Sequence, residues 1–250
     1  MIEKVAPLEQ NPEGTGYLPG LAMDFVIFGF DQYQLKILLL EYRNTNLFAL
    51  PGGFVRENEN MNDAARRVLS ERTGLSDIYL DQFYTFGDLA RYDQAPLRTI
   101  MQAKGLNPTD DHWLLRRFVS VGYYALIDFR KAAPTPDPLS DNCIWYTLEN
   151  LPELMLDHQT IAQKALETLR ADLDRKLGGY DSWAAPLLPK AFTMGELQKL
   201  YETILGQQLR RSSFQRKMLS LDILERLEKQ YSGGAHKAPY LYQFIMDKIS

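Results

Sequence analysis

The sequence PGGFVRENENMNDAARRVLSERTGL, residues 51–75, decides the fold of most of the chain. Its second half predicts an amphipathic helix that begins after Asn60 and ends at Gly74. Asparagine is a residue type that caps helix N-termini, and Gly74 occupies the usual C-terminal cap position. Apolar residues recur at helical spacing and would form the buried face of this helix: Ala64, Ala65, Val68 and Leu69.

The glycine and charged residues of this segment also have a specific spacing. Five residues separate Gly53 from Glu59, and seven more separate Glu59 from Arg67. Continued by Glu71, this pattern resembles the signature of the Nudix family. The resemblance extends over about residues 21–177 and implies the α/β/α sandwich of that family.

Two positions of the predicted helix depart from the family pattern. Where family members carry three metal-binding glutamates, this chain has Val68, Glu71 and Arg72. Because Mg²⁺ requires oxygen ligands and an arginine repels it, we expect no metal, no cofactor and no hydrolysis. Arg72 either binds an anionic ligand or, as we prefer, points to solvent and pairs with Glu71 or Asp77. The degenerate Nudix positions are Glu59, Arg67, Val68, Glu71 and Arg72.

Apolar segments on both sides of residues 51–75 predict the other elements of an α+β domain. Residues 21–30 and 35–42 predict a hairpin of two buried strands. Further elements are strands at 48–50, 82–87, 118–127 and 143–146 and a helix at 161–177. The predicted organisation is a flexible arm at 1–17, a ligand-sensing domain at 18–179 with an insertion at about 92–116, and a linker at 180–189.

Residues 190–250 predict a winged helix-turn-helix domain. Its first helix begins with a capping box made by Thr193 and Glu196. A second, basic helix is expected to begin with Ser213 as its cap, with its apolar side chains facing inward. Helix, helix and hairpin is the order of a winged helix. The inward residues are Phe214 and Met218, and the two strands are expected at 223–231 and 239–244.

The charge of the chain is unevenly distributed. Residues 186–250 carry 10 Lys and Arg against 6 Asp and Glu, whereas residues 1–185 carry 18 against 26. Outward Gln, Arg and Lys side chains on a helix can contact base edges, and flanking cations can neutralise phosphates. A dimerisation appendage with a solvated basic face is the alternative. The candidate DNA-binding residues are Arg210, Arg211, Ser213, Gln215, Arg216, Lys217, His236, Lys237 and Tyr240.

The combination of the two domains is more informative than either one. A degenerate Nudix signature followed by FQRK at 214–217 and PYLYQF at 239–244 resembles the Nudix-related transcriptional regulators of the NrtR type, including their sugar-responsive relatives. The resemblance implies a homodimeric repressor that binds a palindromic operator in double-stranded DNA. It also implies that a small-molecule effector, either ADP-ribose or a sugar such as arabinose, binds the Nudix domain.

The candidate effector-binding residues are Arg43, Gly53, Phe54, Arg72, Arg91, Arg117 and His158. For Arg43, Arg91 and Arg117, a surface charge at a strand end is an equally good interpretation. For His158 we prefer a cap or hydrogen bond at the start of the 161–177 helix, because no metal ligands lie at suitable spacing.

A second function remains open at this stage. Because Glu59, Arg67 and Glu71 are retained, the chain could be an active Nudix hydrolase of nucleoside diphosphate compounds such as ADP-ribose. The single cysteine, Cys143, excludes an intrachain disulfide, fits a cytoplasmic protein and is expected to be a small buried residue. No apolar segment approaches the ~20 residues that span a bilayer, so we expect no membrane partner.

Overall fold

The computed structural model describes residues 11, 13–31, 34–76, 78–175, 177, 184, 187–230 and 238–245. Within these residues a seven-stranded sheet has the order β3-β2-β1-β6-β5, with β4 paired to β1 and β7 paired to β2. Its strands are β1 (Tyr17–Asp31), β2 (Gln34–Tyr42), β3 (Leu47–Ala49), β4 (Gly52–Arg56), β5 (Leu80–Phe86), β6 (Val119–Asp128) and β7 (Asn142–Thr147). The strands β1 and β6 run parallel, and the other pairs are antiparallel.

The helices of this part of the chain are α1 (Met61–Thr73), α2 (Ala95–Ala103) and α3 (His158–Asp172). Short 3-10 turns cover Leu89–Arg91, Trp113–Leu115, Phe129–Lys131 and Leu148–Asn150. Most of these elements lie where the sequence pattern predicts them. The strand β4 is an addition, and α3 begins three residues before the predicted start and ends five residues before the predicted end.

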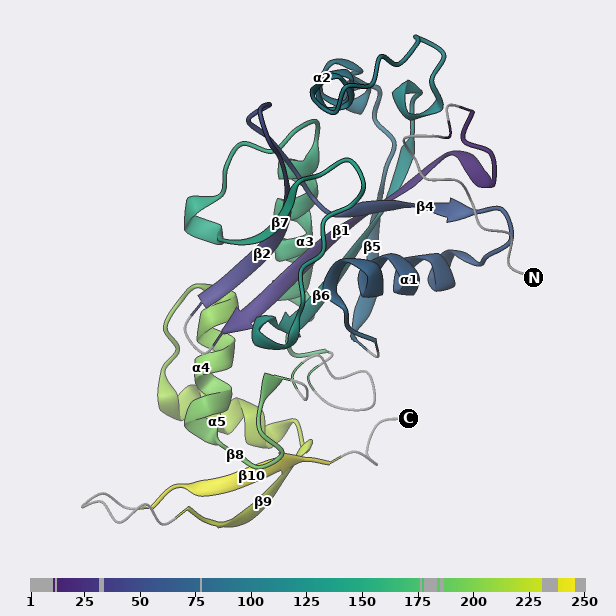
Figure 1. Cartoon of the computed structure of the whole chain (residues 1–250). Helices are drawn as coiled ribbons and strands as arrows, with labels where there is room; N and C mark the ends of the chain where they lie inside the picture. The colour runs from purple at the N-terminus through teal and green to yellow at the C-terminus, as the bar shows by residue number, and fades with distance from the viewer. Residues whose placement is uncertain are drawn as a thin grey trace.

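Helices cover both faces of the sheet because the residues of β1 alternate between two cores. Phe25 and Ile27 pack in the core that contains the apolar face of α1. Val26 and Phe28 point to the opposite face and pack in the core that contains the apolar face of α3. This period of two places one helix on each side of the sheet (Figure 1). The predicted α+β fold and α/β/α sandwich are confirmed.

Part of the expected arm and all of the expected insertion are folded. Asn11 is buried, and the backbone of Gly14 lies against Trp113, where a Cβ atom at Gly14 would come within 2.6 Å of the indole. Tyr17 stacks on the same indole at 5.4 Å. Trp113 belongs to the 92–116 segment and is buried in a third apolar cluster with Ile100 of α2. Apolar residues within a polar segment therefore fix both stretches to the domain.

The C-terminal part of the chain is a winged helix. It contains α4 (Met194–Leu205), α5 (Arg211–Ser220) and a three-stranded sheet of β8 (Phe192–Thr193), β10 (Tyr240–Phe244) and β9 (Leu224–Lys229), in that order, among the described residues. Both hydrogen bonds of the predicted capping box are present, and Gly206 ends α4 in the left-handed conformation. Phe214 and Met218 are buried as predicted.

One predicted helix cap is at the wrong residue, and another has the predicted position without the capping bond. Ser213 lies inside α5, because the helix begins at Arg211, with the Phe214 amide donating to the Arg210 carbonyl. Asn60 occupies the N-cap position of α1, but its side chain makes no capping bond and donates instead to Asp63.

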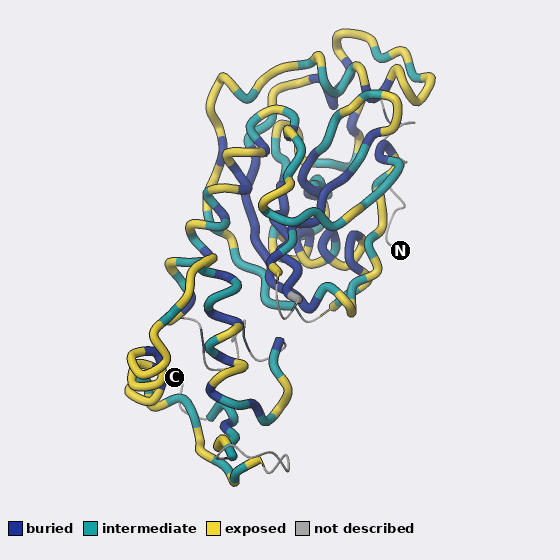
Figure 2. The backbone as a smooth tube through the Cα atoms, turned by 90° about the vertical axis from the view of Figure 1, so that its left-hand side faces the viewer, coloured by how far each residue is buried: buried dark blue, intermediate teal, exposed yellow. Residues whose placement is uncertain are grey.

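The two halves of the molecule share one apolar core. Leu197, Leu200 and Ile204 of α4 belong to the same buried cluster as Phe28 and Ile37 of the sheet. Ala184 and Leu187, from the predicted linker, are buried in this cluster too. Figure 2 shows buried residues concentrated in the sheet, and Figure 1 shows α4 beside the start of β2. Among the residues described, no helix combines the length and apolar character needed to cross a membrane.

Candidate functional site

A cavity of about 370 Å³ lies between β1, β4, α1, the 92–116 segment and the start of α3. Five predicted effector-binding residues line it: Gly53, Phe54, Arg72, Arg91 and His158. Its charged wall consists of Arg56, Arg67, Arg72, Arg91, Arg116, Asp24, Glu71, Asp93 and Asp137. The 92–116 segment therefore forms part of the cavity.

Two of the predicted effector-binding arginines do not line this cavity. The side chain of Arg43 is directed to Asn142 at 3.4 Å on the protein surface. Arg117 donates to the carbonyl of Gly87 at 2.6 Å, also at an exposed position. These side chains are surface groups at strand ends, which was the alternative interpretation for both.

A buried ionic cluster forms one side of the cavity. Arg91 pairs with Asp24 at 3.2 Å and with Asp157 at 3.0 Å, and donates to the carbonyl of Phe118 at 2.9 Å. Its side chain is only 8% exposed. Because the guanidinium is surrounded by acceptors, its charge is balanced within the cluster. Asp24 thus connects β1 to the end of the 3-10 turn that carries Arg91.

His158 joins this cluster to the wall of the cavity. Its Nδ1 accepts a hydrogen bond from the Leu50 amide at 2.9 Å, and its Nε2 lies 3.8 Å from Asp24 Oδ1. Since Nδ1 accepts a hydrogen bond, a proton on neutral His158 belongs on Nε2, the atom that faces Asp24. His158 therefore makes a structural hydrogen bond and also lines the cavity.

Arg72 is buried, and the prediction that it points to solvent is wrong. The residue is 9% exposed, and Nη1 donates to the carbonyls of Thr135 at 3.5 Å and Pro136 at 3.0 Å. Among the described residues its buried Nε has no hydrogen-bond partner, and neither has the Nε of Arg56, another residue that lines the cavity. Because both arginines line the cavity, their guanidinium groups favour a ligand that brings anionic oxygen atoms.

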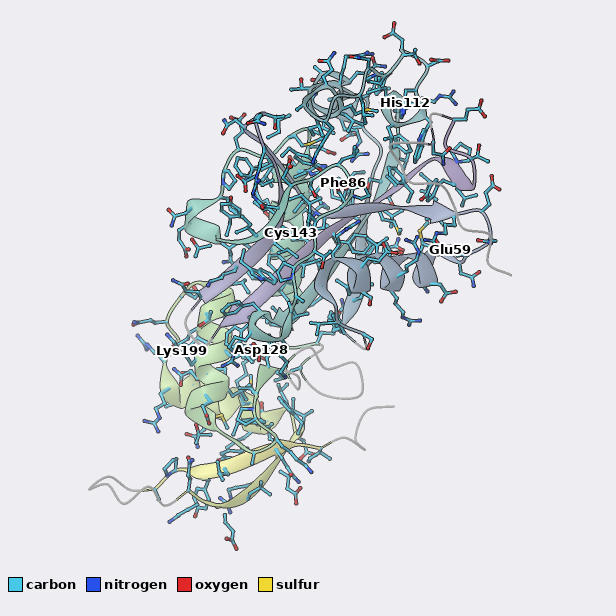
Figure 3. The ribbon with its side chains drawn as sticks, in the orientation of Figure 1. Glu59, Phe86, His112, Asp128, Cys143 and Lys199 are labelled. Carbon is cyan, nitrogen blue, oxygen red and sulfur yellow. The ribbon has the colours of Figure 1, made fainter. Side chains whose placement is uncertain are left out.

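Glu59 and Arg67 fasten the loop after β4 to α1. Arg67 Nε donates to Glu59 Oε2 at 3.0 Å, and Nη2 donates to the Phe54 carbonyl at 2.9 Å. The Arg56 amide also donates to Glu59 at 2.8 Å. Burial raises the pKa of Glu59, but the hydrogen bonds and charge of Arg67 outweigh burial and lower this pKa. Figure 3 shows Glu59 beside the first turn of α1.

The remaining signature positions do not assemble a carboxylate site. Val68 packs against Gly53 so closely that a Cβ atom on the glycine would lie 2.5 Å from Val68 Cγ2. Glu71 accepts from Arg67 at 3.3 Å. Within the described part of the chain, no group of three or more His, Cys, Asp or Glu side chains could hold a metal ion.

An aromatic cluster forms another part of the cavity lining. Phe54 lies edge-to-face against Trp113 with ring centroids 4.6 Å apart, and Phe118 lies 5.4 Å from Phe54. Tyr17 stacks on Trp113. Tyr17, Phe54 and Phe118 line the cavity, so it offers flat apolar surface as well as arginine side chains.

The cysteine is not a reactive group in this structure. Cys143, labelled in Figure 3, lies on β7, and burial raises the pKa of its thiol to about 12. A thiol with such a pKa is protonated at neutral pH and is a poor nucleophile.

The winged helix presents a polar surface on α5. Arg210, Arg211, Gln215 and Arg216 are exposed, and so is Ser213, although it does not cap the helix. Lys217 is exposed too, but its ammonium pairs with Asp174, which follows α3. The exposed Arg, Gln and Ser side chains of α5 are donor groups of the kind that can contact base edges in a major groove.

The candidate residues of the wing are described in part. Tyr240 is 40% exposed, and Arg226 and Lys229 lie over its ring at 4.7 and 5.1 Å. His236 and Lys237 lie outside the described residues. The cations beside Tyr240 were not predicted from the sequence, because they come from the opposite strand, β9.

Several cavity residues were also missed, and one of them had a sequence signal. Asp24 is a lone carboxylate inside the apolar segment 21–30, and such a residue needs a buried partner. Arg56 ends β4 and Arg116 lies in a loop, and neither belongs to a local pattern, so only the tertiary fold shows that they line the cavity.

Comparisons with known proteins agree with this architecture. A family model for the NUDIX domain matches residues 19–169, and a model described as the NrtR DNA-binding winged helix domain matches residues 184–244. The chain is therefore a Nudix protein with a C-terminal DNA-binding winged helix. It is 33% identical over 235 residues to a curated protein of Acinetobacter baylyi named ADPR responsive transcriptional repressor NtrR, covering 91% of this chain and 83% of that protein. The chain belongs to the family of NrtR-type, Nudix-related transcriptional regulators.

Solved structures show the same fold. The crystal structure of Shewanella oneidensis NrtR matches with a TM-score of 0.63 and 25% identity, covering 90% of this chain and 94% of that one. A MutT/nudix family protein from Enterococcus faecalis matches with a TM-score of 0.63 and 22% identity, covering 91% of this chain and 87% of that one.

Proposed function

We propose that this protein is a transcriptional repressor that binds operator DNA through α5 and the wing and releases it when ADP-ribose occupies the Nudix cavity. The observation that carries the proposal is the pair of guanidinium groups of Arg56 and Arg72, which both line the cavity. A diphosphate group supplies the anionic oxygen atoms that such donors need.

The cavity suits a ligand with a flat ring and a charged centre. Its volume of about 370 Å³ lies in the range of small-molecule sites. The rings of Phe54 and Tyr17 offer a surface for a base, and the arginines offer cations for phosphates. The name of the Acinetobacter baylyi relative, which is ADPR responsive, supports ADP-ribose over a sugar.

We further propose that effector binding needs no divalent metal and leads to no hydrolysis. Val68 supplies no oxygen ligand, and Arg72 places a fixed positive charge where family members bind Mg²⁺. At ~4 Å and an effective dielectric constant of about 20, a unit charge repels a divalent ion by roughly 8 kcal/mol. The arginine therefore replaces the metal as the counter-charge of the diphosphate.

The DNA-binding half of the proposal rests on α5 and the family of the winged helix. The exposed Gln215 and Arg216 can reach base edges, while Arg210 and Arg211 can neutralise phosphates. We propose that the protein acts as a homodimer, since a palindromic operator requires two α5 helices related by a two-fold axis.

Thermal unfolding of the full chain with ADP-ribose and EDTA tests the effector. Ligand at ~100 times its Kd should add about 2.7 kcal/mol to the free energy of unfolding. Arg72→Met should weaken ADP-ribose binding at least tenfold, whereas the control Arg66→Met changes an exposed arginine of the same helix and should have no effect. A shift with arabinose or another sugar, and none with ADP-ribose, would identify a sugar-responsive regulator instead.

The hydrolase alternative is tested by incubation of ADP-ribose with Mg²⁺ or Mn²⁺. We expect no AMP and no ribose phosphate above the uncatalysed rate. Hydrolysis by the wild-type protein that is lost in Glu71→Gln would replace the proposed role with catalysis.

A further inference from the structure

Helix α3 extends from the effector cavity to the winged helix. Its 15 residues correspond to a length of about 22 Å. One end carries His158, which lines the cavity, and the other end is followed by Asp174, which contacts α4 and α5. Figure 1 shows α3 behind the sheet, with the winged helix beyond its C-terminal end.

The first end of α3 is held by the cluster inside the Nudix domain. Asp157, the N-cap residue, accepts from Arg91 through both oxygens, at 3.0 and 3.3 Å. His158 accepts from the Leu50 amide. Any ligand that contacts Arg91 or His158 competes with these bonds, so occupancy of the cavity acts directly on the start of the helix.

Among the described residues, Ile204, Tyr201 and Lys217 of the winged helix hold the second end of α3. Arg170 Nε donates to the carbonyl of Ile204, at the last turn of α4, at 2.9 Å. The Tyr201 hydroxyl of α4 lies 3.3 Å from the Leu173 carbonyl and 3.2 Å from Asp174 Oδ1. The other oxygen of Asp174 accepts from Lys217 of α5.

We propose that ligand binding in the cavity changes the position of α3, and that α3 in turn acts on α5. Asp174, which follows the C-terminal end of α3, is the positioning residue that contacts α5. This inference rests on the proposed function. Lys217 lies on the face that would meet DNA, next to Arg216, yet its charge is neutralised by a carboxylate of the sensor domain. Asp174 and a DNA phosphate therefore compete for the same ammonium group, and the position of α3 decides how strongly Asp174 competes.

The contact is well suited to such a switch because it is weak. The side chains of Lys217 and Asp174 are 51% and 44% exposed, and ion pairs this exposed to solvent stabilise a fold little. DNA can therefore break the pair at small cost, and a small displacement of α3 can restore or remove it. If the Lys217–Asp174 pair only stabilised the fold, its loss would not change how operator affinity depends on salt concentration.

The experiment measures operator affinity of the full chain across a range of salt concentrations, with and without ADP-ribose. Asp174→Asn removes the competing charge. We expect it to bind DNA severalfold tighter than the wild type, with a salt slope steeper by up to about 0.9, the value for one additional phosphate contact. Its loss of affinity on addition of ADP-ribose should be smaller than that of the wild type.

Two variants act as controls. Glu167→Gln removes one negative charge from an exposed position of α3, where the partner of Glu167 is Gln163 of the same helix. Its operator affinity, its salt slope and its response to ADP-ribose should all match those of the wild type. Asp174→Glu keeps a carboxylate within reach of Lys217 and should restore the wild-type response.

A double-mutant cycle with Lys217→Gln completes the test. In that background Asp174→Asn should change DNA affinity no more than Glu167→Gln does, because the shared ammonium is absent. Suppose that the wild type responds to ADP-ribose, but Asp174→Asn and Glu167→Gln have the same operator affinity, the same salt slope and the same response to ADP-ribose. The inference about Asp174 is then wrong, and the proposed function stands. A wild type that neither binds the operator nor responds to ADP-ribose contradicts both.

Discussion

At the residue scale, the signature segment contains side chains with two different roles. Glu59 and Arg67 are structural, because they bond to each other and to the backbone of the loop before α1. Arg72 lines the cavity, and its Nη1 donates hydrogen bonds to the carbonyl groups of Thr135 and Pro136. The sequence pattern identifies all three positions but not these roles, because the direction of each side chain depends on segments distant in sequence, such as residues 135–136.

The lowered pKa of Glu59 predicts a pH-dependent contribution to stability. The folded-state pKa lies below the ordinary value of 4.5, so the contribution is present above that value and is lost as the pH falls through the folded-state pKa. At pH 7, Glu59→Gln should lower the free energy of unfolding by about 1–3 kcal/mol, since it weakens a hydrogen-bonded charge pair. Urea denaturation measures this difference, which should shrink below pH 4.5.

The control for this prediction is Glu57→Gln, which removes an exposed carboxylate of the same loop. Its effect should stay within about 0.5 kcal/mol at every pH. An equal effect of both substitutions would show that the loop responds to net charge and not to the Glu59–Arg67 contact.

At the element scale, local patterns predict the elements well and their ends less well. The apolar periodicities place the strands β1, β2 and β6 within a few residues, because each core face has its own spacing. The pattern does not predict β4, whose two glycines are held as a strand only by pairing with β1. Nor does it predict the start of α3, because Asp157 is bound by Arg91, 66 residues away.

The caps of α1 and α4 give a direct comparison between pattern and contact. Both were predicted from residue type, but only Thr193 of α4 makes the capping hydrogen bond, at 3.2 Å to the Glu196 amide. Thr193→Ala should therefore lower the free energy of unfolding by about 0.5–2 kcal/mol. Asn60→Ala, measured in the same denaturation experiment, should have the smaller effect. The reverse order would mean that residue type and not the observed bond determines helix stability here.

At the scale of the whole molecule, the sequence predicts two domains but not their common core. Composition and breaks in periodicity separate residues 18–179 from 190–250, and each half matches its own family model. The burial of Leu200 beside the residues of β2 is a contact between segments with no sequence relation, so no local pattern could indicate it.

This shared core predicts that the two halves unfold together. Leu200→Ala should cost about 2–5 kcal/mol and lower hydrogen-exchange protection equally in β1 and in α4. Leu219→Ala, at a residue 46% exposed on α5, is the control and should change neither. Loss of protection confined to α4 would show that the winged helix opens independently of the sheet.

The contact between Val68 and Gly53 also has a consequence for the evolution of the protein. Val68 fills the space above a glycine that has no room for a side chain, and Arg72 holds the carbonyls of the 135–136 segment. A glutamate at either position alone would forfeit these contacts and still leave too few carboxylates for an ion. No single substitution is therefore both tolerated and useful for metal binding, so we do not expect this protein to regain metal-dependent hydrolysis by single steps. A change of effector specificity does not require these two positions to change together.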